Sequence, residues 1–169
     1  MKHSTLSFAL AATFALLAPA AHATIINVVL DGPQAGVVSP GLGSAVLILD
    51  DVANTLSVDL TFAGLTTPTN NAHIHCCAPP GVAAGVVLPF VPPFVLSTTS
   101  GHFVNTFSLT PILVQDIYSG LSYINIHTTA FPNGEIRGQI PRVVPEPATA
   151  GLIGTAIAAL ALLRRKIVA

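Results

Sequence analysis

Apolar and polar residues alternate along much of the chain between residues 24 and 140. The clearest case is Leu56–Phe62, in which every second residue is a large apolar one and the residues between them are polar. A period of two predicts a half-buried antiparallel strand. The apolar run Ser44–Leu49 precedes it across a short polar connection, so the two runs are predicted to form a hairpin.

Six further runs have the β-branched and aromatic composition of strands and are separated by Gly, Pro, Asn and Asp. These runs are Thr24–Leu30, Ala72–Cys76, Val82–Leu88, Gly101–Leu109, Leu121–Thr128 and Glu135–Ile140. The segment Thr110–Gly120 is interpreted as a short helical turn or a loop. Short strands at regular spacing, with no convincing helix before residue 145, predict an all-β fold. We expect an antiparallel β-sandwich of Greek-key, immunoglobulin-like or barrel-like form.

The first 23 residues have the pattern of a secretory signal peptide. A basic start at Met1–His3 is followed by an apolar run from Leu6 to Leu17, and the segment Pro19–Ala23 ends in an Ala-x-Ala motif. We expect the Sec translocon to export the chain and signal peptidase to cleave it after Ala23. A retained transmembrane anchor fits less well, because the apolar run is short and ends in a cleavage motif.

A second apolar segment, residues 148–163, lies near the C-terminus and contains no charged residue. Its sixteen residues would span about 24 Å as a helix, slightly less than the ~30 Å hydrocarbon core, so it predicts a short transmembrane helix. The basic residues Arg164, Arg165 and Lys166 follow directly. They orient the C-terminus toward the cytoplasm and favour a membrane span over a buried core helix.

The tripeptide Pro145-Glu146-Pro147 stands just before this segment. The tripeptide, the apolar helix and the basic end together resemble the PEP-CTERM sorting signal of Gram-negative bacteria, over about residues 143–169. The resemblance implies an exosortase-type protease that cuts the tail and releases the protein to the cell surface or exopolysaccharide matrix. The tail is then an address and a temporary inner-membrane anchor. The expected organisation is signal peptide 1–23, β domain 24–142 and sorting tail 143–169.

The charge balance excludes one class of partner. Only 8% of the residues are charged, and Arg137 and Arg142 are the only basic residues between the two ends of the chain. A nucleic-acid-binding protein needs clustered basic residues to neutralise phosphates. We therefore expect no nucleic-acid partner.

The stretch Asn71–Gly81 concentrates two histidines and both cysteines. Residues i and i+2 of a strand point the same way, about 6.6 Å apart, so His73 and His75 can offer two imidazoles to one metal ion. Cys77 continues this row if the strand persists. A third imidazole from a neighbouring strand would come from His127 or His102. Neutral imidazole and thiolate suit zinc or copper.

The same histidines also fit a purely structural role, in which they hydrogen-bond to neighbouring backbone or side chains. Zinc sites use three or four protein ligands, and local spacing places only two here. The structural role is therefore favoured, and metal binding is kept as the alternative. A copper–zinc superoxide dismutase is disfavoured because the mature chain has too few histidines for its two-metal site.

Cys76 and Cys77 are adjacent in a chain that we expect to be exported, where thiols tend to oxidise. Consecutive Cα atoms lie ~3.8 Å apart, which is shorter than ordinary disulfides prefer. Three states stay open: a strained disulfide between the two neighbours, an intermolecular bridge, and metal thiolates.

The sequence contains no nucleophile elbow, paired-carboxylate motif or phosphate-binding glycine loop. Glu135 and Arg137 share a predicted strand face at i and i+2, and we interpret them as a surface ion pair. Asn125 and His127 lie on a similar polar face. We therefore predict no catalytic residue, no enzymatic activity and no cofactor, with zinc or copper as the alternative.

Three segments share a recognisable pattern: Ala72-His73-Ile74-His75, Tyr123–Thr128 (YINIHT) and Pro132–Ile140 (PNGEIRGQI). Together they resemble the CHRD domain, first described as a repeat in chordin, over roughly residues 24–140. The pair Cys76-Cys77 departs from the commoner form, in which a Gly often follows the second histidine. The resemblance implies an all-β extracellular module without an established catalytic activity. We expect an exported, non-enzymatic surface or matrix protein, with a metal-binding or redox module as the alternative.

Overall fold

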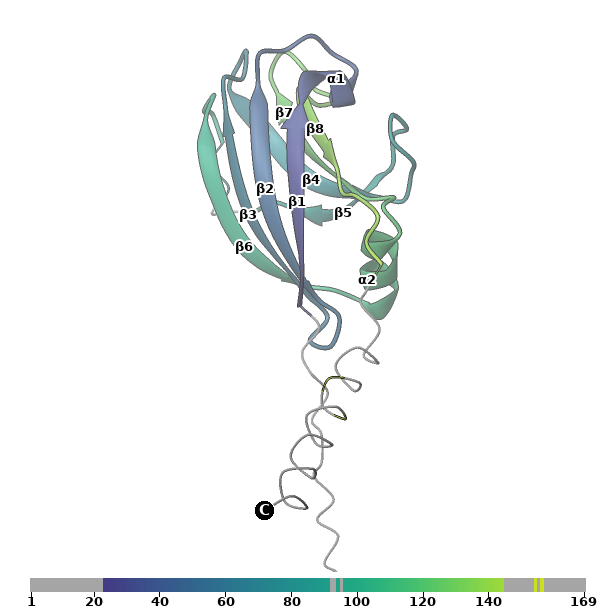
Figure 1. The fold of residues 1–169 in the computed structure, drawn as a ribbon. Helices are drawn as coiled ribbons and strands as arrows, with labels where there is room; N and C mark the ends of the chain where they lie inside the picture. The colour runs from purple at the N-terminus through teal and green to yellow at the C-terminus, as the bar shows by residue number, and fades with distance from the viewer. Residues whose placement is uncertain (1–22, 92–93, 95, 145–153, 155, 157–169) are drawn as a thin grey trace, which may run out of the picture.

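The computed structural model describes residues 23–91, 94, 96–144, 154 and 156 (Figure 1). These residues form one antiparallel sheet with the strand order β5-β4-β7-β8-β1-β2-β3-β6. The strands are β1 (Ala23–Asp31), β2 (Leu42–Asp50), β3 (Thr55–Ala63), β4 (Thr69–Cys76), β5 (Gly85–Pro89), β6 (Gly101–Ser108), β7 (Tyr123–Thr128) and β8 (Ile136–Gln139). The helices α1 (Gly32–Ala35) and α2 (Pro111–Tyr118) lie beside the sheet.

The sheet curls on itself into a nearly closed barrel (Figure 1). The long strands β1, β2, β3 and β6 form one wall, and the shorter strands curl round to face it. Backbone hydrogen bonds between Thr69 and the segment before β6 help to close the gap: Thr69 N donates to Thr98 O at 2.8 Å, and Ser97 N donates to Thr69 O at 2.8 Å. The all-β antiparallel prediction is confirmed, and its barrel-like form is the one observed.

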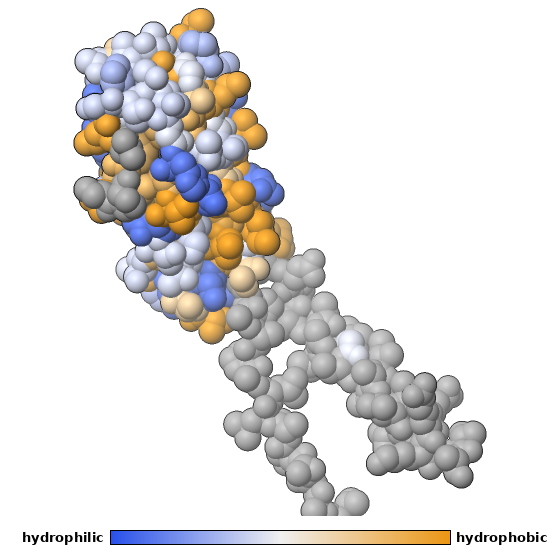
Figure 2. All heavy atoms as spheres, turned by 90° about the vertical axis from the view of Figure 1, so that its left-hand side faces the viewer, coloured by the Kyte–Doolittle hydropathy of each residue, from blue (hydrophilic) through white to orange (hydrophobic). Residues whose placement is uncertain are grey.

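The long wall follows the alternation that the sequence shows. Leu47, Leu56 and Leu60 point into the barrel and are 0% exposed. The alternate residues of this wall point outward, and apolar ones such as Ile25 and Val29 of β1 remain exposed there. Figure 2, viewed from the β6 side, shows apolar and hydrophilic side chains interspersed over this face. The predicted hairpin is the β2–β3 pair.

Aromatic residues fill the space between β3, β6 and the segment that follows β5. Phe90 stacks on Phe103 with ring centroids 4.6 Å apart, and Phe62 stacks on Phe94 at 5.8 Å. Phe107 joins the same group through Phe90. Stacked pairs of this kind add to the free energy gained from burying apolar area.

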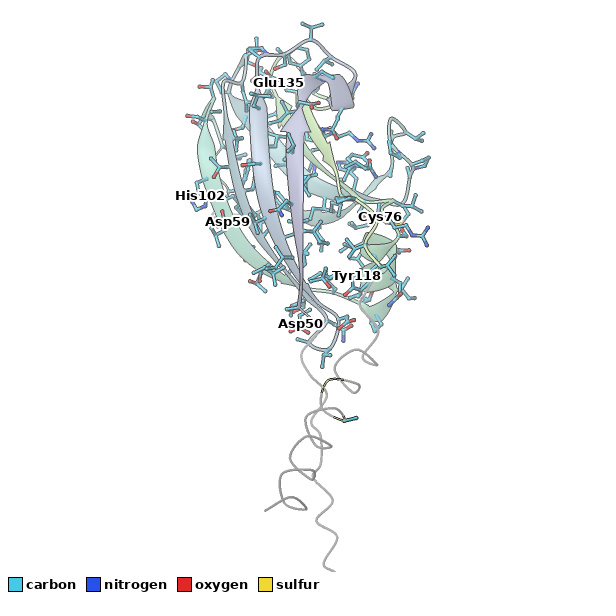
Figure 3. All side chains as sticks on the ribbon, in the orientation of Figure 1. Asp50, Asp59, Cys76, His102, Tyr118 and Glu135 are labelled. Carbon is cyan, nitrogen blue, oxygen red and sulfur yellow. A yellow bond between two sulfur atoms is a disulfide. The ribbon has the colours of Figure 1, made fainter. Side chains whose placement is uncertain are left out.

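The segment Thr110–Gly120, which we interpreted as a short helical turn or a loop, contains the helix α2. Thr110 is its N-cap, since Thr110 Oγ1 accepts a hydrogen bond from Leu113 N at 3.2 Å, and Pro111 follows in the first turn. The helix buries Val114, Ile117 and Tyr118 and lies at the end of the barrel where β1 begins (Figures 1 and 3).

The terminal predictions fall almost wholly outside the described residues. Among the residues that the structure describes, no helix is long and apolar enough to cross a membrane, so the predicted transmembrane helix is not found there. Nearly all of the predicted span 148–163, the sorting tripeptide, the basic end and signal-peptide residues 1–22 lie outside them. The strand β1 begins at Ala23, the residue after which we expect cleavage.

Candidate metal centre

The outward face of β4, β7 and β8 carries a set of polar and aromatic side chains. Residues directly opposite on antiparallel strands share a face. The strand register therefore sets up two cross-strand rows, His73–Asn125–Arg137 and His75–Tyr123–Gln139. The residues between them, such as Ile74 and Ile124, point into the barrel and are 0% exposed.

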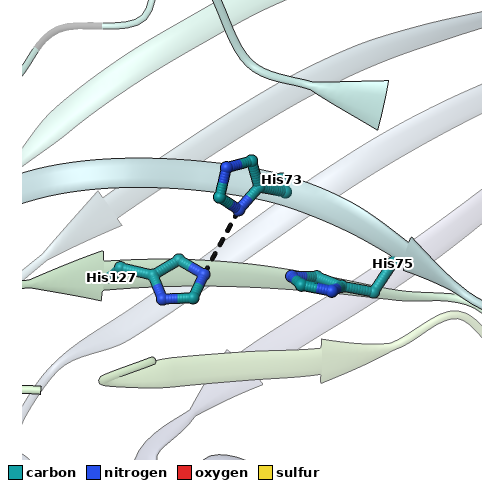
Figure 4. A group of neighbouring side chains, drawn as sticks. All are labelled: His73, His75 and His127. Carbon is teal, nitrogen blue, oxygen red and sulfur yellow. Dashed lines mark hydrogen bonds between the residues drawn. The ribbon is translucent and has the colours of Figure 1, made fainter. Parts of the chain in front are cut away.

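Three histidines meet on this face (Figure 4). His73 and His75 come from β4, and His127 comes from the adjacent strand β7. One ring nitrogen of each lies within 4.8 Å of the others, and His73 Nδ1 is 3.3 Å from His127 Nε2. The i, i+2 spacing thus supplies two imidazoles, and strand pairing supplies the third.

Backbone carbonyls orient two of the three rings. His75 Nδ1 lies 2.9 Å from Ala84 O, and His127 Nδ1 lies 2.8 Å from Pro132 O. A carbonyl oxygen only accepts, so each Nδ1 donates its proton and each Nε2 keeps its lone pair in the neutral ring. A ring held in this way through one nitrogen is the usual arrangement of a metal-ligating histidine.

Two buried polar atoms on this face have no hydrogen-bond partner among the described residues. They are His75 Nε2 and Asn125 Oδ1, and their side chains belong to residues that are only 7% and 5% exposed. An unpaired buried acceptor is uncommon because its desolvation is not compensated. A bound ligand would compensate His75 Nε2, and this atom belongs to the histidine cluster.

The environment keeps two of the imidazoles neutral. The pKa of His73 is lowered to about 4, first by burial and then by the nearby imidazoles of His127 and His75. Burial also lowers the pKa of His75; the hydrogen bond to Ala84 opposes this shift, and His127 and Arg137 add to it. Neutral imidazole is the form that binds metal, so at neutral pH no proton has to leave His73 or His75.

Tyr123 packs against His75 on the side of the histidine cluster that faces β8. Its ring stacks on His75 with centroids 4.7 Å apart and planes 2° from parallel, and Arg137 Cζ lies 3.4 Å from the centre of the tyrosine ring. Tyr123 Oη also accepts a hydrogen bond from Ala84 N at 3.0 Å. Tyr123 therefore fixes His75 directly and also fixes the residue whose carbonyl orients it.

Cys76 and Cys77 form a disulfide with each other. Of the three states that the sequence left open, the structure shows the bond between neighbours, and in this state neither sulfur is a thiolate. The ligand atoms that gather around the sulfurs come from Asp116 of α2 and not from the histidines. Cys77, the fourth candidate ligand, thus lies in a different group from the three imidazoles.

His102, the other candidate for a third imidazole, lies elsewhere. It is on the outward face of β6, where its Nε2 is 2.7 Å from Asp59 Oδ1 on β3 (Figure 3). Both side chains are more than half exposed. The structure therefore brings His127, and not His102, to the pair on β4.

The prediction of a surface ion pair between Glu135 and Arg137 is wrong. Glu135 is 0% exposed and Arg137 is 6% exposed, and the ion pair found among the described residues is His102–Asp59. The reason is that β8 begins at Ile136, so Glu135 belongs to the preceding turn and turns inward. Glu135 lies at the opposite end of the barrel from Tyr118 (Figure 3).

The Glu135 carboxylate joins three segments of the chain. Its Oε1 accepts hydrogen bonds from Ser39 Oγ at 2.7 Å and from Thr66 N at 2.6 Å, and its Oε2 accepts one from Thr128 Oγ1 at 2.7 Å. Burial alone would raise the pKa of Glu135, but the hydrogen bonds from Thr66, Ser39 and Thr128 outweigh burial and lower it. The carboxylate is therefore ionised in the folded protein at neutral pH.

No sequence pattern assigned a role to Tyr123 or Ala84, and Arg137 was expected only in a surface ion pair. The alternation over Leu121–Thr128 did place Tyr123, Asn125 and His127 on one face. It could not show that the loop between β4 and β5 would cover that face, because no local pattern records where a loop packs.

An all-β barrel with a histidine-bearing outer face is the class that the fold and the site define. The family model of the CHRD domain matches residues 26–140, and that of the PEP-CTERM protein-sorting motif matches residues 143–166. The first match covers more than half of the chain, so the chain belongs to the CHRD domain family. Both resemblances are confirmed. No curated protein and no solved structure gave a significant match.

The sorting motif indicates an exported protein that an exosortase sorts at the membrane of a Gram-negative bacterium. It begins three residues after the CHRD match ends, since the two cover residues 143–166 and 26–140. The two matches therefore cover separate stretches of the chain.

Glu135→Gln should destabilise the protein by about 1–3 kcal/mol at pH 7, because an amide nitrogen would face a donor inside the barrel wall. The pKa of Glu135 is lower in the folded protein than its ordinary value of 4.5, so the ionised carboxylate stabilises the fold fully at pH values above 4.5. This stabilisation is lost as the pH falls through the pKa that Glu135 has in the folded protein. The gap in melting temperature between wild type and variant should therefore shrink below pH 4.5.

The matched control is Asp59→Asn, which removes a carboxylate from the exposed pair on the outer face. It should change the free energy of unfolding by no more than about 0.5 kcal/mol. A Glu135→Gln variant as stable as wild type at pH 7, or a melting gap that stays constant down to pH 3, would contradict this role of the carboxylate.

Proposed function

We propose that the protein is an exported, non-enzymatic component of the cell surface or extracellular matrix, and that its tail is a removable sorting segment. The order of the two family matches carries this proposal, because the sorting motif follows the CHRD domain directly. The Sec translocon and signal peptidase would act at the N-terminal end. The tail would hold the protein transiently in the inner membrane until an exosortase cuts it and delivers the barrel to the surface or to an exopolysaccharide matrix.

The last contacts of the barrel support removal of the tail without loss of the fold. The strand β8 ends at Gln139, and the backbone N–H groups of Ile140 and Val143 still bind Ser122 O and Tyr118 O at 2.9 and 3.0 Å. The sorting tripeptide begins after these contacts, at Pro145. A cut beyond residue 144 leaves every strand of the sheet in place.

Replacing Pro145, Glu146 and Pro147 together by alanine should leave the tail uncut. The expected result is a full-length species in the membrane fraction, detected by immunoblot, where wild type gives a shorter, released species whose C-terminus is read by mass spectrometry. Pro141→Ala is the control, because it changes an exposed proline before the sorting motif. Normal processing of the triple variant would refute exosortase recognition of this tripeptide.

Metal binding is the second function that we propose, for the face formed by His73, His75 and His127. Three ring nitrogens lie within 4.8 Å of one another, and two of the rings are oriented by carbonyls. The buried His75 Nε2 has no protein partner among the described residues. Three imidazoles suit zinc or copper and leave one coordination position for a water or another ligand.

Direct contact between His73 and His127 is the competing explanation, since a hydrogen bond across 3.3 Å needs no metal. That contact does not involve His75, whose Nδ1 is held by Ala84 O while its buried Nε2 has no partner among the described residues. Metal binding accounts for all three rings.

The full-length protein, stripped with chelator and then dialysed against zinc or copper, should retain about one metal ion per chain by elemental analysis. His73→Ala/His75→Ala should retain none, because two of three ligands are gone. His102→Ala is the matched control: it removes one histidine from the outer face and should bind as wild type does. Wild type that retains no metal, and melts at the same temperature with and without it, would rule out the site.

A further inference from the structure

A pocket of about 310 Å³ opens on the β8 side of Tyr123, next to the histidine face. Its walls come from α1, from the loop between β4 and β5, and from β8. The lining residues are Pro33, Gln34, Pro80, Gly81, Arg137 and Gln139. This volume is at the lower end of the range for small-molecule sites, so the pocket would admit one small organic molecule.

Arg137 is a buried charge in this wall without an opposite charge. Its side-chain nitrogens donate to Val82 O at 3.0 Å and to Gln139 Oε1 at 2.9 Å, and its guanidinium lies on the Tyr123 ring. All three partners are neutral. Within the described part of the chain, no Asp or Glu oxygen forms an ion pair with Arg137, although the residue is only 6% exposed. A buried charge is costly unless it is paired.

The carboxylate of Asp31, an acidic residue on the neighbouring strand β1, is used elsewhere. Asp31 and Arg137 are opposite each other in the register of β1 and β8. Asp31 Oδ1 instead accepts a hydrogen bond from Gln34 N at 2.8 Å, and Asp31 Oδ2 accepts one from Gln34 Nε2 at 3.3 Å. Asp31 therefore caps α1, and the Arg137 guanidinium in the pocket wall is not paired with it.

The amide groups in the pocket wall are held by the fold. Gln34 Oε1 accepts a hydrogen bond from Gln139 N at 3.0 Å, and Gln139 Nε2 donates to Gly120 O at 2.9 Å. Gln139 also holds Arg137 through its Oε1. The guanidinium is thus fixed before a ligand arrives, which lowers the entropic cost of binding.

We propose that this pocket binds a small organic carboxylate whose carboxyl group pairs with Arg137. A guanidinium presents parallel N–H donors that match the two oxygens of a carboxylate. One buried positive charge balances the single charge of a carboxylate, whereas a phosphate monoester carries nearly two. The prolines Pro33 and Pro80 offer apolar contact to the carbon skeleton of the ligand. This site is separate from the histidine cluster and does not depend on metal.

The test uses sodium acetate, sodium succinate and sodium D-galacturonate as probes, with D-galactose as the neutral counterpart of galacturonate. Each is titrated into the full-length protein, and the side-chain N–H signal of Arg137 is followed by NMR. At least one carboxylate should shift this signal in a saturable way. If galacturonate is that probe, it should bind at least tenfold more tightly than galactose.

Two variants with matched controls assign the binding. Arg137→Gln should weaken it at least tenfold, whereas Arg142→Gln, which removes an exposed arginine, should not. Pro80→Glu should also weaken it at least tenfold, because it places a competing carboxylate at the rim of the pocket. Pro79→Glu adds the same charge to the same loop at an exposed position that does not line the pocket, and it should bind as wild type does.

The Pro80→Glu and Pro79→Glu pair decides the question if Arg137→Gln fails to fold, since both prolines are exposed. For these variants, binding is followed by isothermal titration calorimetry. The proposal is overturned if no carboxylate probe binds saturably, if galacturonate binds and galactose binds as tightly, or if Pro80→Glu binds the carboxylate as well as Pro79→Glu does.

Discussion

The register between β4 and β7 is the constraint on which the outer face depends. It sets His73 opposite Asn125 and His75 opposite Tyr123, with His127 one step along the same face. A slip of β4 by one residue would turn His73 and His75 into the barrel and expose Ile74. Burial of the isoleucines therefore holds the histidines in place, and the apolar core and the polar site are two results of one pairing.

The loop between β4 and β5 joins the two halves of that face. Ala84 O orients His75, and Val82 O accepts a hydrogen bond from Arg137, so one short segment contacts both the histidine cluster and the wall of the pocket beside Arg137. The loop begins beside the Cys76–Cys77 disulfide and is tied to β7 by the bond from Ala84 N to Tyr123 Oη. Through these contacts the loop connects side chains from three strands, His75 of β4, Tyr123 of β7 and Arg137 of β8.

The sequence predicts the parts of the molecule in which one face is buried and the other exposed. Leu56–Phe62 shows its strand directly because its polar residues remain in solvent. In β7 nearly every residue is buried, so alternation identifies the faces but not what covers them. The burial of Arg137 was missed because the sequence does not show that the loop between β4 and β5 contacts it, and the burial of Glu135 was missed because this residue lies in the turn before β8. The sequence left two candidates for the residue that supplies the third imidazole, His127 and His102. A local pattern does not show which distant strand lies beside β4.

X-ray absorption of the zinc-loaded protein tests the central claim, that the outer face of β4 and β7 is a metal site built from three imidazoles. The account predicts an absorption spectrum dominated by nitrogen or oxygen ligands at about 2.0–2.1 Å, with the multiple scattering of three histidine rings, and with one ring lost in His127→Ala. A sulfur ligand at about 2.3 Å, or a spectrum that His127→Ala leaves unchanged, would contradict it.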